Sequence, residues 1–210
     1  FNIHAWLDKI VANNWLGDKT GQGFFKKTKN EKGEKEILTL DLDTMEYGPR
    51  VKPKFATIDA AKPIDDLYSR LKMLVAGHDK AGEFYRLFHY GLFSYISHRI
   101  PEISDELYRV DDGMMGGFGW EIGAFESWDV LGVAKTTEAM KAAGYKVAPW
   151  VDEMLAAGNK SFYKVEAGVK YSYDPASKTY KPLPGGEAFI VMSNYTDKQI
   201  WKNGSCKLYD

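Results

Sequence analysis

A short pattern occurs twice in this sequence, once near each end of the chain. Residues 5–12 read Ala-Trp-Leu-Asp-Lys-Ile-Val-Ala, and residues 149–156 read Pro-Trp-Val-Asp-Glu-Met-Leu-Ala. Each copy is followed by two aromatic residues and a lysine, at 24–26 and at 162–164. The shared order of a tryptophan-containing helix, a turn and an aromatic pair favours duplication over coincidence. A chain duplicated in this way would carry the tail of one structural unit and the whole of a second.

Apolar spacing predicts helices for most of the chain between the two copies. One helix is predicted at residues 3–14 and another at 64–75, the latter ended by Gly77. The longest helix ends before Pro101, and Gly91 on its apolar stripe would permit close approach of another helix. That stripe consists of Phe84, Leu87, Phe88, Leu92, Tyr95 and Ile96. Further helices are predicted at 103–114 (with Ser104 as its N-cap), 126–131, 136–143 and 149–157.

Strand signals lie outside this helical block. Apolar and polar residues alternate at 38–42, and residues 45–47 could return as the hairpin partner. Aromatic and β-branched residues predict strands at 162–165, 169–173 and 179–180. Asn203-Gly204 predicts a hairpin turn near the end of the chain. The sequence therefore predicts a helical bundle with β-rich appendages.

Composition excludes several classes of protein. The 28 basic and 29 acidic side chains leave a net charge of −1, which predicts neither a nucleic acid nor an anionic membrane as partner. The longest uncharged stretch, 87–98, is well short of the roughly 20 residues that a membrane helix needs. The one cysteine, Cys206, cannot form an internal disulfide. We therefore expect a cytoplasmic globular protein.

No residue pattern in the chain points to its own catalytic, metal or cofactor site. The four histidines have no metal-ligand spacing, and no serine or cysteine has the context of a nucleophile. The stretch Gly21-Gln22-Gly23 begins like a dinucleotide-binding motif, but Lys26 stands where the third glycine belongs, and a helix precedes it. We therefore expect no catalytic residue, no metal and no bound NAD within this chain.

Three groups of residues allow both a structural and a functional interpretation. The acidic pairs Asp65-Asp66 and Asp111-Asp112 favour solvated surface. His98-Arg99 can stabilise a helix C-terminus by roughly 0.3–1 kcal/mol, or can line a cleft there. The aromatic group around Gly119 and Gly123 favours core packing, with an acyl-chain or partner surface as the alternative. Its members are Phe118, Trp120, Phe125 and Trp128.

Two longer motifs resemble one protein family. Residues 117–132 read GFGWEIGAFESWDVLG and closely resemble the signature of 3-hydroxyacyl-CoA dehydrogenase C-terminal domains. Residues 16–26 look like the glycine-rich ending of the same domain, and 95–100 are similar to its "FIxNRI" helix. The domain ending at 16–26 comes before the signature at 117–132. This order is expected if the end of one such domain is followed by a second, complete copy. The residues of this structural turn are Gly17, Lys19, Thr20, Gly21, Gly23 and Phe24.

The resemblance implies a mainly α fold, a helical bundle of this C-terminal type with short β-hairpins in the linker and the C-terminal region. Such a domain packs on an NAD-binding domain, closes the acyl-CoA cleft and often mediates dimerisation. The family oxidises 3-hydroxyacyl-CoA by hydride transfer to NAD, with a histidine base and a glutamate in the dinucleotide-binding part. Two positions depart from the family pattern: His98 replaces an asparagine and Ala124 replaces a proline. The lost asparagine favours a scaffold role for this copy.

The resemblance also suggests where residues that touch substrate cleft or interface would lie. These candidates are His98, Arg99, Trp120, Glu121, Phe125 and Trp128. The expected partners are acyl-CoA in the parent enzyme, the missing dinucleotide-binding and hydratase domains, and a second copy of the chain in a homodimer. An interaction or dimerisation module, or a stand-alone acyl-CoA binding module, is the alternative function.

The expected organisation has four parts. Residues 1–30 form the tail of a first dehydrogenase C-terminal domain, and 31–57 form a connector with a hairpin. Residues 58–165 form a second such domain, and 166–210 form a β-rich tail that leads toward a missing downstream domain. The chain would then be a fragment of a longer, fused β-oxidation enzyme.

Overall fold

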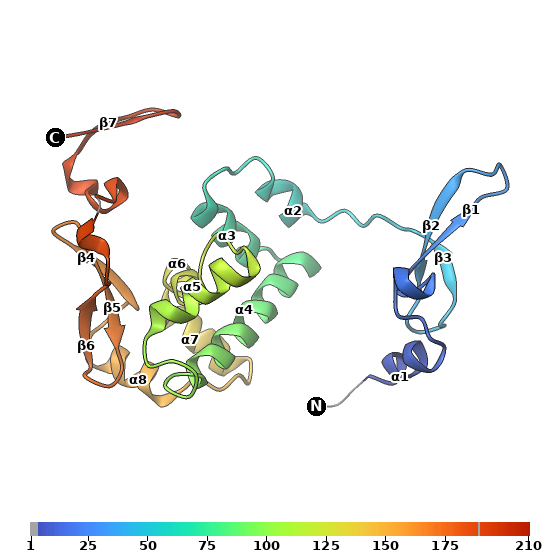
Figure 1. Ribbon diagram of the computed structural model, residues 1–210, viewed down its shortest axis with the longest axis horizontal. Coiled ribbons are helices and arrows are strands. Elements are labelled where there is room, and N and C mark those ends of the chain that lie inside the picture. The colour runs from blue at the N-terminus through green and yellow to red at the C-terminus, as the bar shows by residue number, and fades with distance from the viewer. Residues whose placement is uncertain (1–3, 189) are drawn as a thin grey trace. The chain divides into compact units, whose positions relative to one another are not determined.

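The computed structural model describes residues 4–188 and 190–210 and divides the chain into two compact units (Figure 1). Unit 1 covers Phe1–Lys54 and unit 2 covers Phe55–Asp210. Most of the helices belong to unit 2, and both units contain small antiparallel sheet structure. The prediction of a mainly helical protein with short β-hairpins is confirmed at this level. No helix in the described ranges has both the length and the apolarity of a membrane span.

Unit 1 is a short helix followed by a glycine-rich turn and a three-stranded sheet. Helix α1 (Ala5–Ala12) is shorter than the predicted 3–14, and residues 1–3 lie outside the described part of the chain. After the 3₁₀ turn at Asp18–Thr20, the strands pair in the order β1-β2-β3. Their bounds are β1 (Phe25–Lys29), β2 (Lys35–Leu40) and β3 (Tyr47–Pro49). A hairpin is present in this region, but its strands β2 and β3 are shifted from the predicted 38–42 and 45–47, and β1, which was not predicted, joins it.

Unit 2 begins with a series of helices, and all the helices predicted there are present. Helix α2 was not predicted, because it has only six residues and they show no clear apolar stripe. The bounds are α2 (Ala56–Ala61), α3 (Leu67–Ala76), α4 (Lys80–His98), α5 (Leu107–Phe118), α6 (Ala124–Leu131), α7 (Val133–Ala142) and α8 (Pro149–Ala156). Helix α5 starts four residues later than predicted: Ser104 is not its N-cap but accepts a hydrogen bond from the Glu106 amide at 3.3 Å.

The C-terminal part of unit 2 consists of a second three-stranded sheet and a final hairpin. The sheet contains β4 (Tyr163–Glu166), β5 (Val169–Asp174) and β6 (Thr179–Pro182), in that spatial order. Three 3₁₀ turns follow, at Gly186–Ala188, Met192–Asn194 and Thr196–Lys198. Strands β7 (Gln199–Lys202) and β8 (Lys207–Tyr209) then pair across Asn203-Gly204, so the predicted hairpin is confirmed.

The face of α4 that packs inward differs from the predicted one. Of the predicted stripe only Ile96 is buried, whereas Phe84, Leu87, Phe88 and Tyr95 are exposed. The inward face carries Phe93 together with small and polar residues (Ala81, Gly82, His89 and Ser97). His89 tolerates burial because its Nδ1 lies 2.7 Å from the carbonyl oxygen of Tyr85. The apolar stripe therefore marks an exposed face, and the prediction of the buried side was wrong.

The two sheets show that the duplication extends beyond the sequence match. In unit 1 the amide of Leu40 donates to the carbonyl of Phe24 at 2.9 Å, and in unit 2 the amide of Tyr173 donates to that of Phe162 at 2.7 Å. A tyrosine hydroxyl from the third strand closes each turn. Tyr47 donates to the Gly23 carbonyl at 2.6 Å, and Tyr180 to the Ser161 carbonyl at 2.5 Å. The structural repeat therefore covers residues 5–49 and 149–182.

Candidate functional site

The signature segment forms the corner between α5 and α6. Helix α5 ends at Gly119, whose φ of +68° is a left-handed conformation that glycine adopts without strain. Helix α6 then begins after Gly123 without a side-chain cap from its own N-terminal residue. The cap comes from α5 instead.

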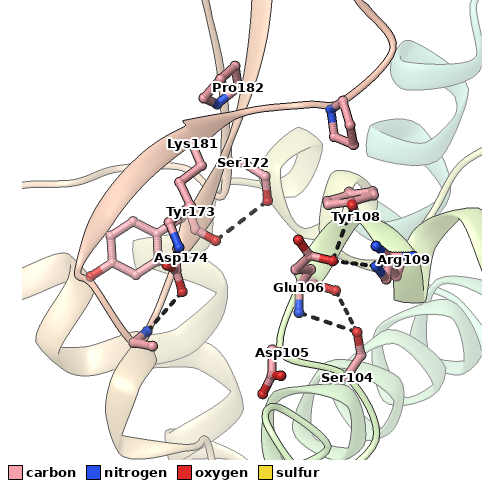
Figure 2. A pocket seen from close by; sticks show the side chains of 12 residues that line it. Ser104, Asp105, Glu106, Tyr108, Arg109, Ser172, Tyr173, Asp174, Lys181 and Pro182 are labelled. Carbon is pink, nitrogen blue, oxygen red and sulfur yellow. Dashed lines mark hydrogen bonds and ion pairs between the residues drawn. The ribbon is translucent and has the colours of Figure 1, made fainter.

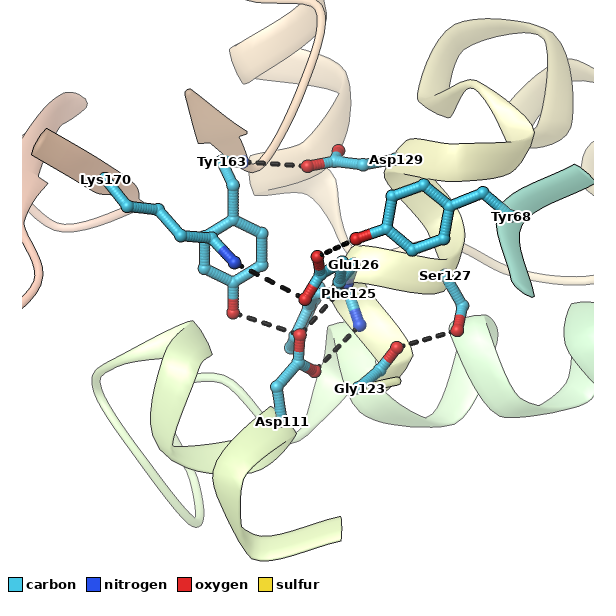
Figure 3. A network of polar contacts seen from close by, with 9 residues as sticks. All are labelled: Tyr68, Asp111, Gly123, Phe125, Glu126, Ser127, Asp129, Tyr163 and Lys170. Carbon is cyan, nitrogen blue, oxygen red and sulfur yellow. Dashed lines mark hydrogen bonds and ion pairs between the residues drawn. The ribbon is translucent and has the colours of Figure 1, made fainter. Parts of the chain in front are cut away.

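Asp111 on α5 supplies this cap. Its carboxylate accepts hydrogen bonds from the amides of Phe125 (2.8 Å) and Glu126 (3.0 Å) and from the Tyr163 hydroxyl (3.0 Å), as Figure 3 shows. A Cβ atom on residue 123 would lie 2.2 Å from the Asp111 side chain, so only glycine leaves room for the carboxylate. The requirement for glycine at position 123 of the motif is therefore steric.

This arrangement corrects the prediction that both members of the Asp111-Asp112 pair are solvated. Asp112 is exposed, but Asp111 is only 3% exposed. The sequence did contain the signal, because Asp111 lies four residues after Leu107 and three before Met114, both of which belong to the apolar stripe of α5. A polar residue on such a stripe is buried wherever partners satisfy it.

A second aspartate joins the signature to the aromatic pair that ends the repeat. Asp129 on α6 accepts hydrogen bonds from the amides of Phe162 at 2.7 Å and Tyr163 at 2.8 Å. Figure 3 shows the bond to Tyr163. These amides precede β4 or begin it, so the carboxylate fixes the point where the chain leaves the helices. The signature and the second copy of the repeat therefore contact each other directly.

The environment of both aspartates shifts their pKa values in the same direction. Burial raises the pKa of Asp111 to about 6 and that of Asp129 to about 7, and the hydrogen bonds that they accept offset part of this effect. Burial and the neighbouring carboxylates also raise the pKa of Tyr163. Because their oxygens are bound by main-chain amides and a phenol, the two carboxylates support the fold and are not poised for proton transfer.

The aromatic candidates fall into two separate places. Phe125 and Trp128 have no exposed surface, and the Trp128 ring stacks on Phe93 with 4.8 Å between ring centroids. The Phe162 ring packs edge-on against Phe125 and tilted against Trp128, with 5.1 Å between ring centroids in each pair. Trp120 lies away from this core, half-buried and 6.1 Å from the exposed Phe88 ring. Phe125 and Trp128 are thus core side chains, and neither lines an open cleft in this structure.

The charged candidates make only local contacts. His98 is exposed at the end of α4, with Nδ1 2.8 Å from the Ser94 carbonyl oxygen. Arg99 forms an ion pair with Glu102 at 3.0 Å and lies over the Tyr95 ring. Glu121 pairs with Arg70 at 3.5 Å. The structure therefore does not gather the six candidates into one site.

The glycine-rich turn of unit 1 is closed by its own backbone. Gly17 and Gly21 have φ values of +110° and +86°, and the Thr20 hydroxyl accepts from the Leu16 amide at 2.9 Å. A Cβ on Gly23 would lie 2.9 Å from the Gly17 backbone, so this position also requires glycine. Lys19 is exposed, and Phe24 meets the Trp6 ring edge-on.

This turn does not fit the pyrophosphate of NAD. A dinucleotide is held by free backbone amides at the start of a helix. Here the amides of Gly17, Thr20, Gly21 and Gly23 donate to carbonyl oxygens of Gln22, Gly17, Asp18 and Phe25 within the turn and β1. The turn is a structural feature that redirects the chain from α1 into the sheet.

Sequence reasoning did not identify one open pocket of about 930 Å³ in unit 2. It lies between the start of α5 and the β5–β6 edge of the sheet, as Figure 2 shows. Both of its cations are paired with carboxylates of the same wall, Arg109 with Glu106 and Lys181 with Asp174. These pairings leave the described lining of the pocket without a free cation that would mark it as an anion site.

Comparison with known proteins identifies one relative over the whole chain and two over part of it. The chain is 34% identical over 212 residues to a protein of Bacillus subtilis (strain 168) named "Probable 3-hydroxyacyl-CoA dehydrogenase", a match that covers 100% of the chain. Proteins of Rickettsia felis and Rickettsia prowazekii, each named "Putative fatty acid oxidation complex trifunctional enzyme", are 23% and 24% identical over 76% and 57% of the chain. No family model and no solved structure matches the chain.

The matches cover only part of each relative. The chain spans 26% of the length of the Bacillus protein and 20% and 15% of the two Rickettsia proteins. The first match runs through both units and so includes the signature at 117–132 and the glycine-rich turn at 16–26. Over its whole length the chain is therefore homologous to part of a protein named as a 3-hydroxyacyl-CoA dehydrogenase.

Proposed function

We propose that the chain is part of an NAD-dependent 3-hydroxyacyl-CoA dehydrogenase of fatty-acid β-oxidation. In this proposal it has the helical-bundle fold of the family's C-terminal domain, and it supplies scaffold, cleft closure and domain contacts. Hydride transfer takes place on a dinucleotide-binding domain outside these residues. The whole-chain match to the Bacillus protein is the observation that carries the proposal.

The chemistry of the described side chains supports a scaffold role. The buried carboxylates Asp111 and Asp129 are bound by backbone amides, and the amides of Gly17, Thr20, Gly21 and Gly23 donate to carbonyl oxygens within the glycine-rich turn and β1. His98, Arg99, Trp120 and Glu121 keep some accessible surface, so they remain available for contacts with substrate or with another domain. Phe125 and Trp128 act from the core by fixing the position of α6.

The test compares the 210-residue chain with the longer protein that contains it. Each is supplied with NAD and a 3-hydroxyacyl-CoA, and NADH formation is followed by absorbance. The longer protein is expected to reduce NAD and the 210-residue chain is not. Turnover by the chain alone would contradict the scaffold role, whereas an inactive longer protein would contradict the dehydrogenase assignment.

The exposed face of α4 favours a second function, self-association. Phe84, Leu87, Phe88 and Tyr95 are 63%, 46%, 43% and 59% exposed, and they share one side of the helix. Apolar residues grouped in this way are typical of interaction surfaces. Sedimentation of the chain should then show a dimer that Leu87→Glu dissociates. The matched variant Leu208→Glu, at an exposed position of β8, should leave the dimer intact.

A further inference from the structure

Unit 1 leaves three apolar side chains largely exposed. Leu7 and Val11 on α1 are 38% and 60% exposed, and Phe24 after the turn is 48% exposed. We call these three residues the α1 apolar face. Burying such side chains against a partner removes apolar surface from water, which is the main driving force for association.

The repeat shows what happens to the corresponding residues in unit 2. Leu7, Val11 and Phe24 correspond to Val151, Leu155 and Phe162 in the second copy. Val151 and Phe162 have no exposed surface there, and Leu155 packs against the same core. The same helix, turn and sheet are therefore docked onto a helical domain in one copy and left uncovered in the other.

The backbone amides of the aromatic pair also differ between the two copies in whether they have a carboxylate partner among the described residues. In unit 2 the amides of Phe162 and Tyr163 donate to the Asp129 carboxylate. Phe25 lies opposite Thr39 in unit 1, just as Tyr163 lies opposite Ser172 in unit 2. The Phe25 amide is therefore directed away from the neighbouring strand, as the Tyr163 amide is. Phe24 and Phe25 thus present two adjacent amides in the geometry that a carboxylate accepts in unit 2.

We infer that the α1 apolar face is the docking surface for another helical domain of the kind formed by α3–α7. That domain would receive Phe24 in an aromatic pocket and bind the amides of Phe24 and Phe25 with an aspartate that corresponds to Asp129. Unit 2 of this chain is not that domain, because Phe162 already fills its pocket. The longer length of the relatives leaves room for such a domain in the parent polypeptide.

The experiment follows the backbone amides of residues 22–26 by hydrogen exchange, in the 210-residue chain and in the longer protein. The amides of Phe24 and Phe25 are expected to exchange on the order of 100-fold more slowly in the longer protein, because docking must open before they exchange. Phe24→Ala in the longer protein should remove this protection and lower a melting temperature by at least about 5 °C. In the 210-residue chain the same variant removes only the edge-on contact with Trp6, so it should lower the melting temperature by less than in the longer protein.

Phe118→Ala is the matched control, because it removes a ring of the same size that is 80% exposed and has no place in the repeat. It should leave the protection of residues 22–26 intact. Equal exchange in the two proteins would overturn the inference, and so would an equal loss of stability in both on Phe24→Ala. The inference rests on the repeat and its readout is protection, so it can hold even if the longer protein fails to reduce NAD.

Discussion

Gly123 is the residue at which the signature motif has the clearest steric requirement. Replacing it with alanine places a Cβ atom 2.2 Å from the Asp111 side chain, so either the carboxylate or the start of α6 must move. We expect Gly123→Ala to lower the free energy of unfolding by about 1–3 kcal/mol in urea denaturation. Gly116→Ala is the control: it lies in α5 with open space around its Cβ, so it should stabilise by up to about 1 kcal/mol. Equal effects of the two variants would contradict this account of the motif.

The buried aspartates also predict how stability depends on pH. In the unfolded chain an aspartate has a pKa of about 3.9, whereas burial raises the pKa of Asp111 to about 6 and that of Asp129 to about 7. The folded state therefore binds more protons than the unfolded state between these values. The stabilisation is complete below about pH 4 and is lost as the pH rises toward 7.

Asp129→Asn tests this by removing one of the two titrating groups. Between pH 4 and pH 7 its free energy of unfolding should fall less than that of the natural chain, by on the order of 1–3 kcal/mol. Urea denaturation at several pH values measures the difference. Asp112→Asn, at the exposed neighbouring position, should keep the slope of the natural chain. An unchanged slope in Asp129→Asn would contradict the prediction.

At the scale of elements, the sequence predicted the existence of the helices better than their orientation. The apolar period located α3 and α4, and proline at the first position located α8. The apolar stripe did not identify the buried face of α4, because that face carries Gly82, His89 and Ser97. Their burial depends on hydrogen bonds and close packing, which a hydropathy pattern does not record. Tertiary contacts decide such cases.

The glycine-rich turn of unit 1 gives a prediction about one element. Gly21 has a φ of +86°, and no atom lies within 4 Å of the place that a Cβ would occupy, so alanine there is disfavoured by backbone strain alone. Gly21→Ala should cost unit 1 about 1–2 kcal/mol. Hydrogen exchange in β1 and β2 should then become faster, while α4 and α6 are unaffected. Gly48→Ala, in β3 with open space and no positive φ, is the matched control and should change little.

At the scale of the whole molecule, the repeat was visible in the sequence but its extent was not. The tryptophan helix and the aromatic pair matched, whereas the strands of the two sheets share little sequence. What they share is backbone pairing and a tyrosine that closes the turn, Tyr47 in one copy and Tyr180 in the other. The link from Asp129 to the amides of Phe162 and Tyr163 was equally hidden, because those residues are more than thirty positions apart in the chain. Geometry, rather than residue identity, is what the two copies have in common here.

The two units have separate cores, and this predicts separate stabilities. Phe162 lies in the aromatic core of unit 2, and Leu40 is 5% exposed in unit 1. Phe162→Ala should destabilise unit 2 by about 3–5 kcal/mol and Leu40→Ala should destabilise unit 1 by about 2–5 kcal/mol, because each leaves a cavity. Hydrogen exchange resolves the two: Phe162→Ala should accelerate exchange in α4 and α6, and Leu40→Ala in β1 and β2. In the double variant the two effects should add, since the two residues belong to different cores. Faster exchange throughout both units on either single substitution would show instead that the chain unfolds as one cooperative body.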